Sequence, residues 1–183
     1  PPVPSLLAAA IYLPLYQLGL ELDYGWNLSY YLIILLTVKL FWMLSVLAFY
    51  EALKFVSVDK KKRFMLNLVF ALASSMFTWS ATFNNHSLAA SSLMIGLMFY
   101  LRGRKTGGVA ALAGSGLFFG LAGAMDIPTS IFFLGFGWLV IRKWKVGVQT
   151  LAFALAASVP FGVHLVINYS IGGTLLPLQM VPE

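Results

Sequence analysis

The chain has 183 residues, of which 60% are hydrophobic and only 10% charged, with a formal net charge of +6 and no cysteine. A soluble domain carries about 45–50% apolar and about 25% charged residues, so this composition predicts a membrane protein. The lack of cysteine excludes disulfides, thiol nucleophiles and cysteine metal ligands. No stretch combines basic residues with exposed aromatics in a polar context, so nucleic acid is not an expected partner.

The first 29 residues precede the long apolar stretches. The chain begins PPVPS, without an initiator Met or the basic region of a signal peptide, which predicts a fragment of a longer protein. Residues 5–20 are apolar but few, and they include Pro14 and Gln17. They form either a marginal membrane span or an amphipathic helix in the outer interface. The short length, the nearby tyrosines and Trp26 favour the interfacial helix.

Six apolar stretches follow, and a span needs about 20 such residues to cross about 30 Å of hydrocarbon. Because lipid cannot satisfy open backbone groups, we expect helices. The predicted fold is an all-α transmembrane helix bundle of about six spans plus an N-terminal interfacial helix, with residues 1–183 as one domain. The outer-side segment is 1–29, the six spans occupy 30–168 and an outer tail follows at 169–183. The spans are expected at about 30–53, 64–83, 87–101, 107–125, 128–141 and 146–168.

Basic residues follow the first, third and fifth predicted spans, and they make up eleven of the twelve lysines and arginines. If the spans alternate in direction, all eleven lie on one side of the membrane. By the positive-inside rule this side is cytoplasmic. They are Lys54, Lys60, Lys61, Lys62, Arg63, Arg102, Arg104, Lys105, Arg142, Lys143 and Lys145.

Polar turns occupy the opposite side: Asn84-Asn85-His86, Asp126-Ile127-Pro128 and Asn168. The third and fifth predicted spans have only about 14–15 residues, or about 21–22 Å of helix. We therefore expect the first two turns to lie below the outer surface, lining an outward-facing pocket. The alternative is that they only end and begin helices, with Ser87 as an N-cap and Asp126 at a helix start.

Lys39 is the one cation within a predicted span. Its ammonium either meets an anion, such as Asp126 or a ligand phosphate, or extends to the outer headgroups. His164 lies four residues before Asn168 and is predicted to be a core histidine bonded to a neighbouring helix. The histidines and Asp126 lack the ligand spacing of a metal site, so no divalent metal is indicated. Gly116, Gly120 and Gly123 predict a close helix–helix contact.

Four stretches resemble, in order, the motifs of one enzyme family. They are PPVPSLLAAAIYLPLYQLGL, FNNHSLAASSLMIGLMFYLR, GLFFGLAGAMDIPTSIFF and INYSIGGTLLP. The first resembles P-G-x-S-L-L-A-x-P-x-Y and the second N-H-x-x-A-A-x-x-L-x-x-L-x-x-Y-L-L-R. The third resembles G-L-x-x-G-L-A-x-x-x-D-x-P and the fourth N-Y-x-x-x-G-x-x-x-P. The family is the bacterial polytopic type C glycosyltransferases, which include protein mannosyltransferases and lipid A aminoarabinose transferases.

The resemblance implies an enzyme of the bacterial inner membrane that transfers a sugar from a polyprenyl-phosphate carrier to an acceptor on the outer face. Its partners would be the bilayer and the lipid-linked donor. The general base of the family is an acidic residue that would precede Pro1, and Glu21 and Asp23 come too late to match it.

Lys39 could hold the phosphate of the carrier. The candidate cavity residues are Asn84, Asn85, His86, Asp126, Lys39 and Asn168. Two other classes stay open: a transporter or permease module with an outward-facing polar cavity, and a non-catalytic scaffold.

Overall fold

The computed structural model describes residues 2–22, 27–56 and 59–175. Within these ranges all regular structure is helical, as predicted. Asp23 and the predicted tail after residue 175 lie outside the described residues. The helices are α1 Pro2–Gln17, α2 Leu28–Ile34, η1 Leu35–Lys39, α3 Leu40–Ala52, η2 Leu53–Val56, α4 Lys60–Ala73, α5 Ser75–Trp79, α6 Asn85–Thr106, α7 Val109–Met125, η3 Ile127–Thr129, α8 Ser130–Trp144 and α9 Val148–Gly172.

The segment from α2 to η2 is one long helix that includes a π-helical turn at η1. It begins at Asn27, whose side chain accepts a hydrogen bond from the Tyr30 backbone N–H at 3.1 Å and so caps the first turn. Two helices, Leu28–Val56 and Val148–Gly172, are long and apolar enough to cross a membrane. Val109–Met125 is a shorter apolar helix.

Two predicted spans differ from the observed helices. The stretch 64–83 is not continuous, because Ser74 takes an extended conformation (φ −84°, ψ 150°) between α4 and α5. The stretch 87–101 is too short, because α6 continues through the basic residues to Gly107, which ends it at φ 69°. Cations are favourable near a helix C-terminus, so Arg104 and Lys105 mark the end of the apolar stretch and not of the helix.

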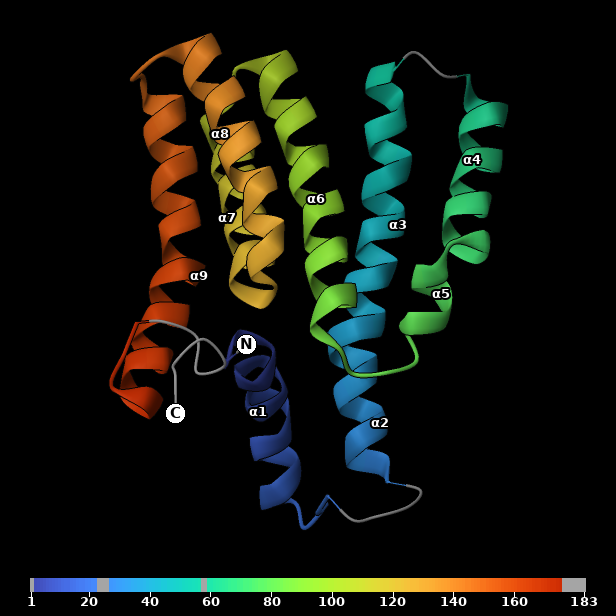
Figure 1. Cartoon of the computed structure of the whole chain (residues 1–183). Helices are drawn as coiled ribbons and strands as arrows, with labels where there is room; N and C mark the ends of the chain where they lie inside the picture. Colours follow the sequence, from blue (N-terminus) through green and yellow to red (C-terminus); the bar gives the residue numbers. More distant parts are fainter. Residues whose placement is uncertain (1, 23–26, 57–58, 176–183) are drawn as a thin grey trace.

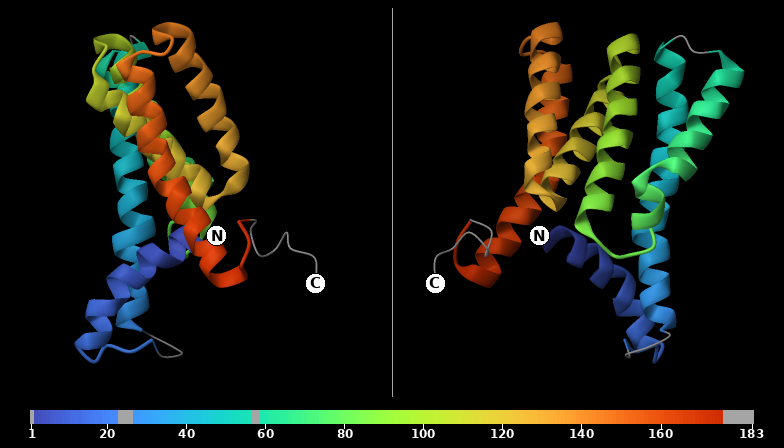
Figure 2. Two further views of the ribbon diagram at one scale, coloured as in Figure 1. Left: turned by 90° about the vertical axis from the view of Figure 1, so that its left-hand side faces the viewer. Right: turned by 45° about the vertical axis from the view of Figure 1, so that its right-hand side comes forward.

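The centre of the bundle is α7, which packs most extensively on α9 and α6. Figures 1 and 2 show these helices side by side, with α8 against α7 and α9. The α7–α9 contact depends on the predicted glycines, since a Cβ at Gly116 would lie 2.0 Å from the Phe153 carbonyl oxygen. At Gly120 it would lie 2.5 Å from the Ala157 carbonyl oxygen. Two helix backbones thus meet where only glycine fits.

Aromatic rings fill the space beside this contact. Phe119 of α7 stacks on Phe136 of α8 with ring centroids 4.6 Å apart, and Phe153 of α9 stacks on Phe133 of α8 at 5.6 Å. Phe119 and Phe153 are almost fully buried, at 1% and 2% exposure. Such rings contribute both buried area and favourable ring geometry, so this cluster holds α7, α8 and α9 together.

The N-terminal helix joins a second core. Val3 of α1 packs with Val38, Leu88 and Met125, which come from η1, α6 and α7. In Figures 1 and 2, α1 lies beyond the ends of α6, α7 and α8, beside α2. Its side chains after Pro4 are half-buried or exposed. This end of the bundle therefore consists of α1, α2 and the last turns of α9.

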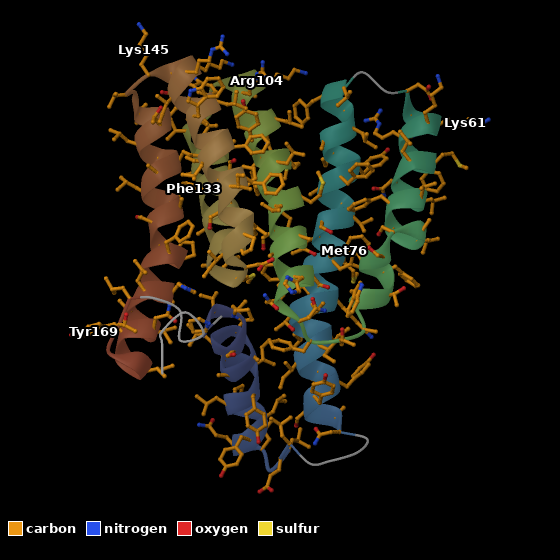
Figure 3. All side chains as sticks on the ribbon, in the orientation of Figure 1. Lys61, Met76, Arg104, Phe133, Lys145 and Tyr169 are labelled. Carbon is orange, nitrogen blue, oxygen red and sulfur yellow. The ribbon has the colours of Figure 1, made fainter. Side chains whose placement is uncertain are left out.

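The basic residues gather at the opposite end, which we call the basic end. Lys61, Arg104 and Lys145 all lie there, whereas Tyr169 lies toward the other end (Figure 3). These three residues belong to the start of α4, the end of α6 and the turn after α8. The segregation of charge along the sequence is thus also a segregation in space.

We predict that Gly116→Ala destabilises the bundle by about 1–3 kcal/mol, because its methyl group would overlap backbone atoms of α9 and force the helices apart. Gly135→Ala in α8 is the matched control, since a Cβ there has no atom within 4 Å. The control should be neutral or stabilising by up to about 1 kcal/mol. Unfolding free energies in detergent would measure both. Equal stabilities would contradict the close α7–α9 contact.

Candidate functional site

The turn between α5 and α6 is fixed by Asn84. Its side-chain oxygen accepts a hydrogen bond from the Ser87 backbone N–H at 2.7 Å, and its amide donates to the Trp79 and Thr82 carbonyls at 3.1 Å each. Asn84 is therefore the N-cap of α6. The prediction of Ser87 as the cap was wrong, because a cap must precede the first helical turn and Ser87 lies within it.

Asn85 connects this turn to the end of α7. Its amide donates to the Met125 carbonyl oxygen at 3.3 Å, across 40 residues of sequence. That carbonyl lies in the last turn of α7, where no intrahelical donor remains. Asn85 thereby satisfies a helix-end acceptor and brings the two predicted polar turns together.

His86 and Asp126 form the central contact of the site. Nδ1 of His86 lies 2.9 Å from Oδ2 of Asp126, and the side chains are 75% and 17% exposed. Asp126 ends α7 and precedes η3, but its carboxylate caps neither helix. Its backbone is held separately, since the Thr129 hydroxyl donates to the Asp126 carbonyl at 2.7 Å. The Asp126 carboxylate is therefore directed at Nδ1 of His86.

The pair is set back from the tips of α2 and α9 at this end of the bundle, and we call this position the recess. Figure 1 shows α2 and α9 extending past the start of α6 and the end of α7. The predicted reason for the recess was wrong for the turn before α6, because α6 has 22 residues and is about 33 Å long, whereas α8 is short as predicted, with 15 residues. At the start of α6 the neighbouring helices extend further, whereas the Asp126 turn also precedes a short helix.

A cavity of about 350 Å³ opens beside His86. Ser87 also faces it, is 1% exposed and has a hydroxyl oxygen without a hydrogen-bond partner in the described part of the chain. Met76 and Ala90 line both this cavity and a second one of about 290 Å³, which is apolar and extends to Trp42, Phe70 and Phe136. The cavity beside His86 is lined by Ser75, Met76, Trp79, Asn84, His86, Ser87 and Ala90.

Lys39 does not pair with Asp126, so that predicted pairing was wrong, whereas a ligand phosphate as its anion stays a prediction. Its ammonium lies 5.0 Å from the ring centroid of Tyr31, eight residues earlier in the same long helix, and the side chain is half-buried. A cation over an aromatic face is stabilised without a carboxylate. The direction, toward the start of α2, agrees with the other alternative, extension to the outer headgroups.

Asn168 also lies apart from the His86–Asp126 pair. Its amide nitrogen is 3.0 Å from Nε2 of His164, and both residues are 5% exposed. His164 is a core histidine as predicted, and it interacts both with Asn168 of its own helix and with the backbone of Ala124 on the neighbouring α7. Among the described residues, no group of three His, Cys, Asp or Glu side chains gathers as a metal site would require.

Hydrophobicity along the sequence does not indicate that α5 contributes to the site. Ser75, Met76 and Trp79 line the cavity because the chain bends at Ser74. The adjacent serines at positions 74 and 75 are the only local signal, since serine side chains compete with helical hydrogen bonds.

Comparison with known proteins found no match to a family model, a curated protein or a solved structure. The functional assignment therefore depends on the site itself.

We predict a coupling of about 0.5–1 kcal/mol between His86→Ala and Asp126→Ala in a double-mutant cycle of unfolding free energy, because their contact is short but the imidazole is largely exposed. His86→Ala with Glu51→Gln is the control pair, since Glu51 belongs to the far end and pairs with Lys54. These two changes should be additive. An additive result for His86 and Asp126 would mean that their contact has no energetic consequence.

Proposed function

We propose that the chain is part of a multi-pass membrane glycosyltransferase that transfers a sugar from a polyprenyl-phosphate carrier to an acceptor at the recessed end. The observation that carries this proposal is the His86–Asp126 contact at 2.9 Å beside a cavity with a few polar lining residues, which shares Met76 and Ala90 with a second, apolar cavity. A lipid-linked donor has the same two parts, a charged head and a hydrocarbon chain.

Placement across a membrane is supported by the exposed surface. Large apolar side chains are exposed along α4, α8 and α9, including Leu72, Leu134 and Leu155 at 61%, 66% and 68%. Exposed apolar surface of this extent is unfavourable in water but favourable against lipid. The basic end would face the cytoplasm by the positive-inside rule, which places the recess on the outer side. The six helical segments of 28–172 would be the spans.

In the proposed mechanism, Asp126 orients His86 and the imidazole acts on the substrate. The carboxylate occupies Nδ1, which leaves Nε2 to face a ligand in the cavity. In its protonated form the ring donates Nδ1–H to Asp126 and can donate Nε2–H to an oxygen of the leaving carrier phosphate as negative charge develops there. The deprotonation of the acceptor would belong to the acidic general base that the family resemblance implies upstream of Pro1.

Sidedness is tested by cysteine labelling, which the cysteine-free chain permits without background. Arg104→Cys should react with a membrane-impermeant maleimide only from the cytoplasmic side, because Arg104 lies at the basic end. Thr82→Cys and Tyr169→Cys, both exposed, should react only from the outside. Labelling of positions 82 and 104 from the same compartment would refute the proposed topology and the outer site with it.

Activity is tested in membranes that contain the full-length protein and a panel of radiolabelled polyprenyl-phosphate sugars. Asp126→Asn should lower kcat by about tenfold to 100-fold, since a misoriented imidazole loses transition-state hydrogen bonding, and His86→Ala by at least as much. Tyr169→Phe, an exposed residue at the same end, is the control and should keep full activity. Full activity of both site variants would remove His86 and Asp126 from the mechanism.

A transporter is the second candidate, and two interruptions favour it: the break at Ser74 and the π turn at Leu35–Lys39. Discontinuous helices and recessed polar groups are typical of transport sites. Uptake of a labelled solute into proteoliposomes, without sugar transfer from any lipid-linked donor, would support this alternative against the enzyme.

A further inference from the structure

The cations of the basic end occupy two different electrostatic environments. One group lies at helix C-termini, where Arg104 and Lys105 end α6 and Arg142 and Lys143 end α8. The helix dipole stabilises cations there. Two of these cations also have local contacts: the Lys143 ammonium donates to the Arg104 carbonyl oxygen, and the Arg142 guanidinium lies 5.4 Å from the Trp138 ring centroid. Lys105 lies over the Phe55 ring, so Lys105, Arg142 and Lys143 each have a partner.

The other group lies at the N-terminus of α4, where the dipole disfavours cations. The sequence Lys60-Lys61-Lys62-Arg63 forms the first turn of this helix. Asp59 is the single carboxylate beside it: Oδ1 accepts from the Lys62 backbone N–H at 3.0 Å, and Oδ2 lies 3.3 Å from the Lys62 ammonium. The Lys62 backbone N–H holds the pKa of Asp59 below its usual value, so this carboxylate stays ionised.

The remaining charge at this turn is unbalanced. Lys60 and Lys61 are exposed and have no ion pair among the described residues. The Arg63 guanidinium lies 5.3 Å from the Tyr50 ring centroid, and its Nε is buried without a hydrogen-bond acceptor in the described part of the chain. Several cations at the positive end of a helix with one counter-charge call for an external anion.

The surface next to these cations shows which kind of anion fits. No residue of α4 is buried, and Phe64, Met65 and Val69 are 56%, 54% and 59% exposed directly below the lysines. Figure 1 shows α4 at the edge of the bundle, beside α3. The anion must therefore bind where charge meets exposed hydrocarbon-compatible surface. A lipid supplies phosphate and acyl chain at that boundary, whereas a soluble phosphate supplies only the first.

We propose that the first turn and outer face of α4 form a binding surface for anionic phospholipid on the basic side of the membrane. The lipid phosphate is held by Lys60 and Lys61, and its chains lie along Phe64, Met65 and Val69. The inference rests on the membrane placement proposed above but not on sugar transfer. It assigns α4 a lipid contact that the other basic residues do not share.

Native mass spectrometry of the full-length protein in detergent, titrated with phosphatidylglycerol or phosphatidylcholine, tests the proposal. The protein should bind phosphatidylglycerol more tightly. One cation near an anionic surface contributes about fivefold to association, so Lys60→Gln/Lys61→Gln should weaken phosphatidylglycerol binding by about tenfold or more. Arg142→Gln/Lys143→Gln removes the same charge from the helix C-terminus and should change binding by less than about threefold.

The outcomes separate the possible explanations. An equal loss in both double variants would mean that only net charge matters, which overturns the proposal. Displacement of phosphatidylglycerol by inorganic phosphate, but not by chloride of equal ionic strength, would mean a soluble-anion site and would also overturn it. Retained thermal stability of the α4 variant in detergent would exclude unfolding, and is expected because the dipole disfavours the lysines. Equal binding of both lipids refutes this inference alone, whereas a protein that dissolves without detergent refutes the membrane placement too.

Discussion

The backbone contact between α7 and α9 is the constraint on which the rest depends. Because Gly116 and Gly120 have no Cβ, α9 lies directly on α7, and the space around them is closed by Phe119, Phe153 and their neighbours. With α7 held on one side by α9 and on the other by α6, its last residues meet the first residues of α6. The site is thus positioned by packing of glycines and rings at a distance from it.

The polar side chains that precede helices differ in whether they cap the helix. Asn27, Asp59 and Asn84 each precede a helix and each accept a backbone N–H three residues later, so their oxygens are occupied by capping. Asp126 occupies a similar place before η3 but makes no such bond. Its carboxylate is directed instead at a histidine on another helix. A carboxylate that does not cap its own helix, paired with a largely exposed imidazole, is available for the role proposed above.

Much of this arrangement could be predicted from the sequence, and the predictions that were wrong have identifiable physical reasons. Apolar length and basic punctuation predict where the long helices lie, and the polarity of the turns predicts that Asn85, His86 and Asp126 gather at one end. The predicted end of a helix is wrong where charged residues continue the helix, as at Arg104. Two individual contacts were not predicted because a residue of the same helix takes the place of a partner at the site: Lys39 lies over Tyr31, and Asn168 bonds to His164. The residues of α5 that line the cavity were not predicted, because the bend at Ser74 brings them there and hydrophobicity does not reveal this bend.

The bend at Ser74 connects α4, which begins at the basic end, with α5, which lines the cavity beside His86. Since α4 contacts α3 but is not buried anywhere along its length, its position relative to α6 is set by few contacts of its own. Phe70 and Met76, on either side of the bend, line the apolar cavity that adjoins the His86 site. A lipid bound at the lysines of α4 would therefore hold the helix that forms one wall of that cavity. Through this helix, the charge at one face of the membrane would influence the width of the cavity at the other.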